Sequence, residues 1–416
     1  MFKTPRQSVG PMFDLRLDEI PLPASKNDRE KLISWLIDTL CLHRRRGENA
    51  ADDGTFSPIH RILSEHLFKD PSKGYETREL AEDLGLTPAA IHHHFVRLVS
   101  AGLISTSSGK GWKNYYLTGG SIDKAIANMK ARSQLIHSQR LEIFDEVWSR
   151  GKKVAMKIEL PPDGKPSALL RIKEWGPLEE GESELSRFMA DIGLLGERPG
   201  KEIVADSLSV RIFEMLLNSG APISIDEAAK ALDGPKPRVG RILERFRSTG
   251  MVERVARTDR LSTALWSAMT TQYMRRGEDW LLKKGGFERL SVPNSLLKNL
   301  KKGTCEPETI ERALKSMEAK DQMLLLNLLG GRLPLGHRLV GMDVAMLKQK
   351  SMDDLNRVIR RIEKVVEKEP EHPDPQISFS HSKWDRSPFT LKAFLSSHSL
   401  MLCLALLLVV LESGLQ

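Results

Sequence analysis

The stretch LTPAAIHHHFVRL at residues 86–98 predicts a short helix with a well-defined start. Thr87 can cap the first turn with its hydroxyl, and Pro88 suits the first helical position, where a main-chain N–H has no helical partner. Apolar side chains then recur at helical spacing at Ile91, Phe95 and Leu98, so these three should face a core. The side chains expected on the opposite, outward face are Ala89, Ala90, His92, His93 and Arg97.

The segments on either side of this helix complete a known order of elements. Residues 77–84 predict a shorter amphipathic helix, and Gly85 begins a tight turn between the two helices. After Gly102, residues 103–105 and 112–117 predict a β-hairpin with a basic tip. This is the order of a winged helix-turn-helix, which places its second helix in the major groove of DNA. The candidate DNA contacts here are Ala89, His92, His93, Arg97, Lys110 and Lys113.

The same pattern recurs 148 residues further along the chain without a gap, which indicates an internal repeat. Ser224 and Glu227 predict a capping box at the start of its first helix. Asp233 and Gly234 predict the turn, and the second helix should start within residues 235–237. The positions Glu79, Ala81, Leu84, Ile91, Arg97, Leu98, Gly102 and Leu103 recur as Glu227, Ala229, Leu232, Val239, Arg245, Phe246, Gly250 and Met251.

The second copy is the more basic of the two. Val239, Leu243 and Phe246 should face its core, which leaves a basic outward face at the spacing that suits guanine edges or phosphates. We expect residues 251–256 and 261–267 to form its wing strands. The candidate DNA contacts in this copy are Lys236, Arg238, Arg241 and Arg245 on the helix, with Arg257 and Arg260 at the wing tip.

The charge distribution supports a polyanionic partner. The chain has a net charge of +8 and a pI near 9.2. Residues 87–118 contain three basic and no acidic side chains, whereas both positioning-helix segments are net acidic. Basic runs are usually solvated surface, but the same polarity appears in both copies. This repetition favours DNA binding.

Residues 86–98, followed by AGLI at 101–104, resemble the recognition helix and strand entry of prokaryotic ArsR-like and MarR-like winged-helix regulators. The resemblance covers the two segments of roughly sixty residues each. It implies a transcriptional regulator that binds operator DNA as a homodimer. The second copy matches less well, because prolines and Gly240 replace small polar residues of the helix.

The expected fold class is mainly α with small β-hairpin wings. A long helix and a β-hairpin segment join the two winged domains, and a C-terminal helical region follows. The expected divisions are an N-terminal arm and helix (1–54), the first winged helix-turn-helix (55–119), a long helix (120–150), a β-hairpin and short helix (151–205), the second winged helix-turn-helix (206–270), a helical region (271–370), a linker (371–390) and a hydrophobic segment (391–411).

Two of these segments have alternative interpretations. The apolar stripe of residues 120–150 exceeds what so small a domain can cover, which predicts a dimerisation helix, with packing inside the monomer as the alternative. Residues 393–411 are uncharged and lie near the length that spans a bilayer. They suggest a membrane tail anchor; a buried or interfacial helix is the alternative.

The sequence offers no catalytic motif, so we expect no enzymatic activity and no cofactor. The run His92 to His94 cannot converge on one metal ion, because neighbours on a helix point about 100° apart. The three cysteines are widely spaced, which predicts neither disulfides nor a zinc site and fits a cytoplasmic, nucleoid-associated protein. The alternative function is a winged-helix adaptor that binds proteins in chromosome organisation, replication or basal transcription. The sequence names no small-molecule effector.

Overall fold

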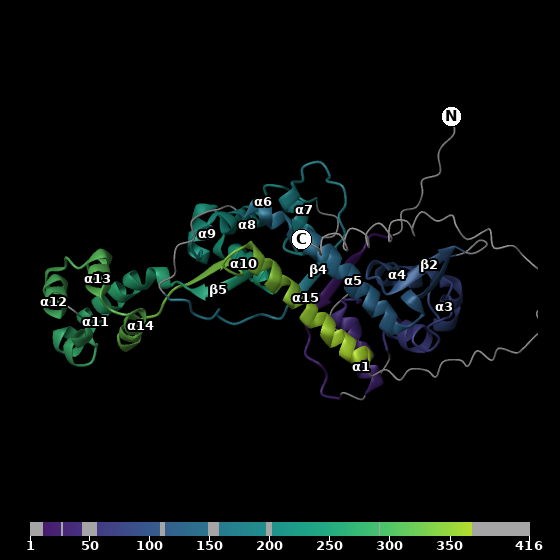
Figure 1. Ribbon diagram of the computed structural model, residues 1–416, viewed down its shortest axis with the longest axis horizontal. Helices are drawn as coiled ribbons and strands as arrows, with labels where there is room; N and C mark the ends of the chain where they lie inside the picture. Colours follow the sequence, from purple (N-terminus) through teal and green to yellow (C-terminus); the bar gives the residue numbers. More distant parts are fainter. Residues whose placement is uncertain are drawn as a thin grey trace, which may run out of the picture. The chain divides into compact units, whose positions relative to one another are not determined.

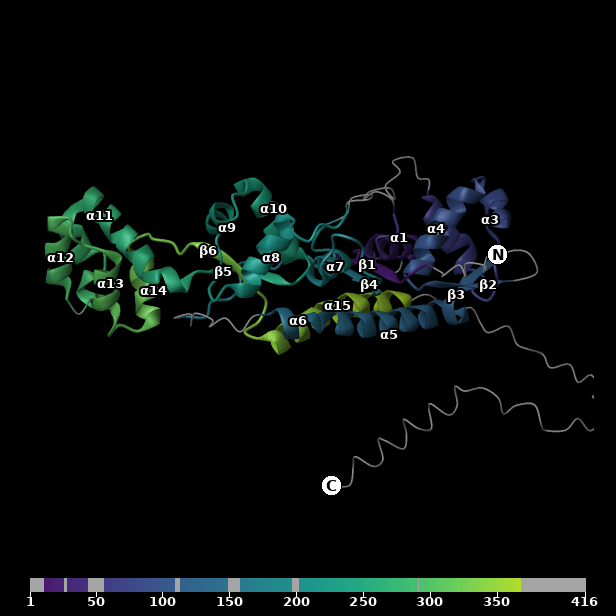
Figure 2. The same ribbon diagram turned by 90° about the horizontal axis from the view of Figure 1, so that it is seen from above.

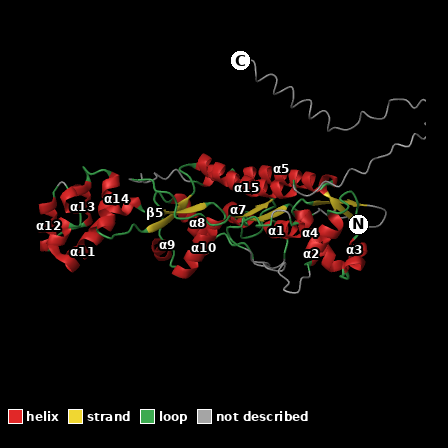
Figure 3. Cartoon of the chain, turned by 90° about the horizontal axis from the view of Figure 1, so that it is seen from below, coloured by secondary structure: helices red, strands yellow, loops and turns green. Residues whose placement is uncertain are grey.

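The computed structural model describes residues 11–25, 28–43, 56–108, 113–148, 158–196, 202–290 and 292–367. These residues belong to one compact unit, Met1–Glu369. Their structure is mainly helical, with three two-stranded antiparallel sheets (Figure 1; Figure 3, strands in yellow). The predicted fold class, mainly α with small antiparallel hairpins, is confirmed at this level.

The first predicted winged segment contains the expected helices and hairpin. Its wing strands pair from Ile104 with Leu117 to Ser108 with Lys113. An isolated bridge between Tyr75 and Tyr115 adds a third strand position. The elements are α2 (Pro58–Arg61), the π-helical η1 (Ile62–Leu67), α3 (Thr77–Leu84), α4 (Pro88–Ser100), β2 (Ile104–Ser108) and β3 (Lys113–Leu117).

The second segment has the expected helices but a different hairpin. It contains α8 (Leu208–Asn218), α9 (Ile225–Ala231), α10 (Lys236–Ser248) and the strand β5 (Val252–Ala256). The predicted second wing strand at 261–267 is wrong: these residues start the helix α11 (Leu261–Lys283). Leu261 and Leu265 are four residues apart and fully buried, which is helical and not strand spacing.

The partner of β5 is instead a strand much later in the chain, β6 (Leu335–Leu339). Between the two strands the chain forms a helical body with its own hydrophobic core, which we call the insertion and which extends from Thr258 to Leu333. The described part of residues 271–370 is mainly helical, as expected, but β6 was missed. The elements of the insertion are η3 (Thr258–Arg260), α11, η4 (Phe287–Arg289), α12 (Pro293–Lys302), α13 (Pro307–Leu314) and α14 (Ala319–Leu328).

A second long-range sheet joins the N-terminal arm to the middle of the chain. The strand β1 (Asp14–Asp18) pairs with β4 (Leu169–Lys173) in antiparallel register. The predicted hairpin within residues 151–205 is therefore wrong for its described part, because the partner of β4 is β1. Leu15 and Leu17 are fully buried and alternate with charged residues, so the arm follows strand periodicity.

Each of these strands precedes a short helix. The helix α1 (Arg29–Thr39) follows β1, and α7 (Glu184–Asp191) follows β4. Asp28 and Ser183 cap the two helices through their side chains. Both helices lie within the ranges in which a helix was expected.

The long helix after the first wing finds its partner inside the chain. Residues 122–147 form α5 (Ile122–Leu141) and α6 (Ile143–Val147), and α5 packs on α15 (Val344–Val366). The two run antiparallel (Figure 2), since Lys130 pairs with Glu363 and His137 contacts Ser351. Of the two interpretations of this helix, packing inside the monomer is the one observed.

Three hydrophobic cores organise the described residues. The first contains β1, α1, the first winged segment and the C-terminal half of α15. The second contains α7, the second segment (α8 to α10 with β5 and β6), and Leu141 and Phe144 at the end of the α5–α6 stretch. The third is the core of the insertion. None of the described helices is both long and apolar enough to cross a membrane. The expected linker 371–390 and hydrophobic segment 391–411 lie outside the described residues.

Candidate nucleic-acid interface

The start of α4 agrees with the sequence prediction. The hydroxyl of Thr87 accepts a hydrogen bond from the main-chain N–H of Ala90 at 3.3 Å, and Pro88 is the first helical residue. Gly85, at the end of α3, has a φ of 68°. That left-handed conformation favours glycine and makes the tight turn between the two helices possible.

The two faces of α4 also agree with the prediction. Ile91, Phe95 and Leu98 are fully buried, whereas Ala89, His92 and His93 are exposed. The Phe95 ring packs against Tyr115 of β3, with centroids 4.3 Å apart, and this contact fixes the helix against the wing. The exposed face of α4 therefore presents a methyl group and two imidazoles.

Arg97 differs from the other predicted contacts on α4. It is partly buried, and its guanidinium donates a hydrogen bond to the main-chain carbonyl of Leu42 at 3.1 Å. This bond ties α4 to the segment that follows α1. In this structure Arg97 holds the first winged segment to its neighbour and does not extend outward.

The predicted wing contacts are only partly described. Lys113 is exposed at the first position of β3, where it points into solvent at the tip end of the hairpin. Lys110 lies outside the described residues. Lys113 can therefore approach a phosphate beside the groove that α4 would enter.

The second segment starts its helices as predicted. The capping box is present: Ser224 accepts from the N–H of Glu227 at 3.2 Å, and Glu227 accepts from the N–H of Ser224 at 2.8 Å. Asp233 has a φ of 47° in the turn. The helix α10 begins at Lys236, and Val239, Leu243 and Phe246 form its buried face.

The exposed face of α10 carries a cluster of cations. Lys236, Arg238 and Arg241 are all exposed. Lys236 pairs with Asp226 at 2.7 Å, but both side chains are largely in solvent, so this pair is easily exchanged for a phosphate. The Nε of Arg241 donates to the carbonyl of Pro237 one turn earlier, at 3.3 Å. We call these three side chains the α10 basic face.

Arg245 departs from the prediction in the same way as Arg97. It is partly buried and donates to the carbonyl of Leu195 at 3.0 Å, in the segment after α7. Arg97 and Arg245 are corresponding positions of the repeat, so both copies use this arginine to hold the preceding segment. The sequence predicted that both side chains contact DNA. An arginine near a helix end looks the same in sequence whether it binds DNA or a main-chain carbonyl of the same protein.

The expected place of Arg257 and Arg260 at a hairpin tip of the second copy is wrong, because helical residues follow β5. Arg257 is 5% exposed and forms ion pairs with Glu227 and with Asp259, the latter at 2.6 Å. Arg260 is exposed but pairs with Glu227 at 3.3 Å. Both arginines stand where the chain leaves β5 for the insertion, so they no longer lie on a hairpin tip. Burial alone would raise the pKa of Glu227, but hydrogen bonds from Ser224 and Arg257 lower it to about 2.

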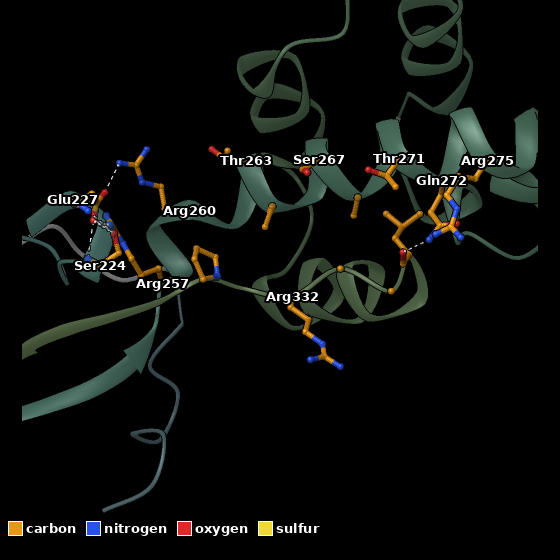
Figure 4. Close-up of a pocket in the computed structure, with 16 residues that line it drawn as sticks. Ser224, Glu227, Arg257, Arg260, Thr263, Ser267, Thr271, Gln272, Arg275 and Arg332 are labelled. Atoms are coloured by element: carbon orange, nitrogen blue, oxygen red, sulfur yellow. Dashed lines mark hydrogen bonds and ion pairs between the residues drawn. The ribbon is translucent and has the colours of Figure 1, made fainter. Parts of the chain in front are cut away.

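A cleft of about 700 Å³ lies where the insertion joins the second segment. Thr263, Ser267 and Thr271 follow one another along one side of α11 in it (Figure 4). Gln272 donates to the carbonyl of Leu329 at 3.0 Å and ties α11 to the end of α14. Hydroxyls and guanidiniums suit an anionic group, but Arg257 is already neutralised by Glu227 and Asp259.

Comparison with known proteins finds a match for the first winged segment. Residues 63–106 match the model of bacterial regulatory proteins of the arsR family. The match extends from η1 through α3 and α4 into β2, so it includes the whole helix-turn-helix. No curated protein and no solved structure matches the chain. The chain therefore contains one helix-turn-helix domain of this kind, which indicates a DNA-binding transcriptional regulator.

Proposed function

We propose that this protein regulates transcription by binding double-stranded DNA through two winged helices in tandem, α4 and α10 being the two recognition helices. The observation that carries the proposal is the exposed basic face of α10 on the same scaffold as the matched helix-turn-helix. Binding needs no catalysis and no cofactor. The protein would act in the cytoplasm, on the nucleoid.

The strand register supports a second winged helix. In the first segment Tyr75 bridges Tyr115, which faces Thr106 in the wing. In the second segment Ile223 bridges His337, which faces Arg254. Tyr75 and Ile223 are corresponding positions of the repeat, and so are Thr106 and Arg254.

Both segments thus share three strand positions in one arrangement. The difference is that the insertion occupies the place of the second wing tip. As a result, β6 starts 79 residues beyond the end of β5.

The α10 basic face provides the test of this proposal. Selection of duplexes from a random library by the full chain first supplies a bound sequence. Replacing Arg241 by Ala should then cost about 1–3 kcal/mol of binding free energy if the guanidinium bonds a base. If it meets a phosphate, the slope of log affinity against log salt concentration should fall by about one. Arg238→Ala is measured in the same way.

Arg312→Ala is the matched control. Arg312 is also exposed on a helix and donates to the carbonyl of Glu308 one turn earlier, but it lies on α13 of the insertion. Its replacement should leave affinity and salt slope unchanged. Equal effects in the Arg241 and Arg312 variants would remove α10 from the interface, and selection that enriches no duplex would refute DNA binding by the chain.

A further inference from the structure

We propose that the chain is an internal pseudo-dimer. Two halves meet about a local two-fold axis, so a single copy binds a duplex with two unlike half-sites. The inference rests on the proposed function, because it states which class of DNA the two winged helices recognise. The sequence resemblance led us to expect a homodimer. In the inferred pseudo-dimer, the interface that two copies would form lies within one chain.

Each half has the same order of elements. The first contains a strand, a short helix, a winged segment and a long helix, which are β1, α1, residues 58–117 and α5. The second repeats that order with β4, α7, the segment that starts at α8 and ends at β6, and α15. The insertion is the main addition to the second half. The repeat seen in the sequence is therefore only the central part of a longer one.

The sheet between β1 and β4 shows the symmetry directly. A two-fold axis requires that the residues nearest to it meet their own equivalents. Arg16 lies twelve residues before the N-cap Asp28 of α1, and Arg171 lies twelve residues before the N-cap Ser183 of α7, so the two are equivalent by a count that does not depend on the sheet. These two residues pair with each other. Asp14 accordingly pairs with Lys173, and Asp18 with Leu169.

The pair of long helices shows the same symmetry at a second place. Gln134 is the thirteenth residue of α5, and Asn356 is the thirteenth residue of α15. The side-chain amide of Gln134 donates to that of Asn356 at 2.6 Å. Two antiparallel helices that cross at equivalent residues are the arrangement of an isologous dimer interface, here within one chain (Figure 2).

The burial pattern is reciprocal as well. The stretch that follows the first wing inserts Phe144 into the core of the second half. The helix that follows the second wing inserts Val366 into the core of the first half. Phe144 and Val366 are equivalent positions, each the twenty-third counted from the start of α5 or α15. Each half is thus completed by the last helix of the other, as in an obligate dimer.

The two recognition helices are nevertheless different. The outward face of α4 presents Ala89, His92 and His93, whereas that of α10 presents three cations. Guanidiniums favour guanine edges and phosphates, while a methyl group contacts the thymine methyl. A homodimer would repeat one half-site as an inverted repeat. This chain should instead prefer two different half-sites, with the steeper salt dependence at the one that α10 contacts.

The DNA test uses the full chain and duplexes selected from a random library. We expect complexes with the mass of one chain and one duplex, and winning sequences with two unlike half-sites. A double variant with His92→Ala and His93→Ala should lose base preference at one half-site. A double variant with Arg238→Ala and Arg241→Ala should lose it at the other half-site. A palindromic site occupied by two chains would overturn the inference and leave the proposed function standing.

A second experiment tests the internal pairing without DNA. Gln134→Cys and Asn356→Cys are introduced into a chain whose Cys41, Cys305 and Cys403 are replaced by Ser, and the protein is oxidised. We expect a cross-link within one chain, with the mass of the 46.8 kDa monomer on a denaturing gel. A covalent dimer would show that α15 packs on another copy and would overturn the inference. If no duplex is enriched, the proposed function fails. The cross-link still shows whether α5 and α15 pack within one chain or between two copies.

Discussion

At the scale of single residues, Arg140 and Asp191 form a buried ion pair that contributes to the stability of the second half. Their ion pair, 2.5 Å long, joins α5 to α7 with both side chains at most 4% exposed. Burial raises the pKa of Asp191, against the effect of the Arg140 guanidinium. In the other half the equivalent positions are Ile362, the nineteenth residue of α15, and Leu36, the eighth of α1, both buried in the first core. An apolar pair thus occupies the place of an ion pair.

Replacing Arg140 alone by Ile should destabilise the protein by about 3–5 kcal/mol, because it leaves the Asp191 carboxylate buried without its main partner. Adding Asp191→Leu should restore most of this loss. Lys173, which lies 3.6 Å from Asp191, is about a quarter exposed and can turn to solvent. Urea unfolding of the two single variants and the double variant measures the difference. A double variant as unstable as Arg140→Ile would contradict the proposed equivalence of the two pairs.

At the scale of elements, the α5–α15 pair contains a buried titratable group. His137 of α5 is 2% exposed and shares a hydrogen bond of 2.8 Å with the Ser351 hydroxyl of α15. Burial lowers the pKa of His137 from 6.5 to about 4. Between these values the unfolded chain binds a proton that the folded chain does not.

The free energy of unfolding should therefore fall as the pH drops from about 6.5 towards 4, by about 3 kcal/mol over this window from His137 alone. Above the window the contribution is constant. The measurement compares urea unfolding of the protein with that of His137→Gln at pH 7, 6 and 5. His337, which is also buried, remains in both proteins, so its effect cancels. Parallel stability curves for the two proteins would refute this role of His137.

The elements that the sequence predicted well are those determined by local signals. Thr87 with Pro88, and Ser224 with Glu227, mark helix starts within one turn, and both were confirmed. Residues 261–267 were misassigned because a second wing strand was expected soon after β5. The four-residue spacing of Leu261 and Leu265 was the available sequence signal for a helix, and both side chains are buried in the structure.

The two missed strands had weaker signals. Alternation of Leu15 and Leu17 with charged residues could have revealed β1. The five residues of β6 offer little that could have revealed a strand. The strand is recognised mainly by its pairing with β5, which is far away in sequence. The candidate site was predictable for the same reason as the caps: the exposed and buried faces of α4 and α10 follow from helical spacing. The contacts of Arg97, Arg245 and Arg257 inside the chain were not predicted, because their partners Leu42, Leu195 and Glu227 are distant in sequence.

At the scale of the whole molecule, the insertion should be separable from the rest of the described chain. Its core contains buried residues from Leu261 to Leu329 and none from the other two cores. The strand ends that flank it are adjacent, because Ala256 pairs with Leu335 and the N–H of Arg257 donates to the carbonyl of Pro334 at 2.8 Å. A two-residue turn can join such ends.

Replacing residues 258–333 by Asn-Gly should therefore leave a cooperatively folding protein that binds the same duplex. The dependence of unfolding free energy on urea should fall by roughly a fifth, since this slope scales with the surface exposed on unfolding. Circular dichroism and duplex titration provide the measurements. Loss of cooperative unfolding in the shortened chain would mean that the insertion is needed to hold β5 and β6 together.

The separation of β5 from β6 also sets the timing of synthesis. The wing hairpin of the first segment can form once β3 has left the ribosome. The second must wait, because Leu335 follows Ala256 by 79 residues. At about 5–20 residues per second this is a delay of roughly 4–16 s. During that interval β5 has an open edge, so another strand can pair with it and the nascent chain is exposed to aggregation while the insertion is being made.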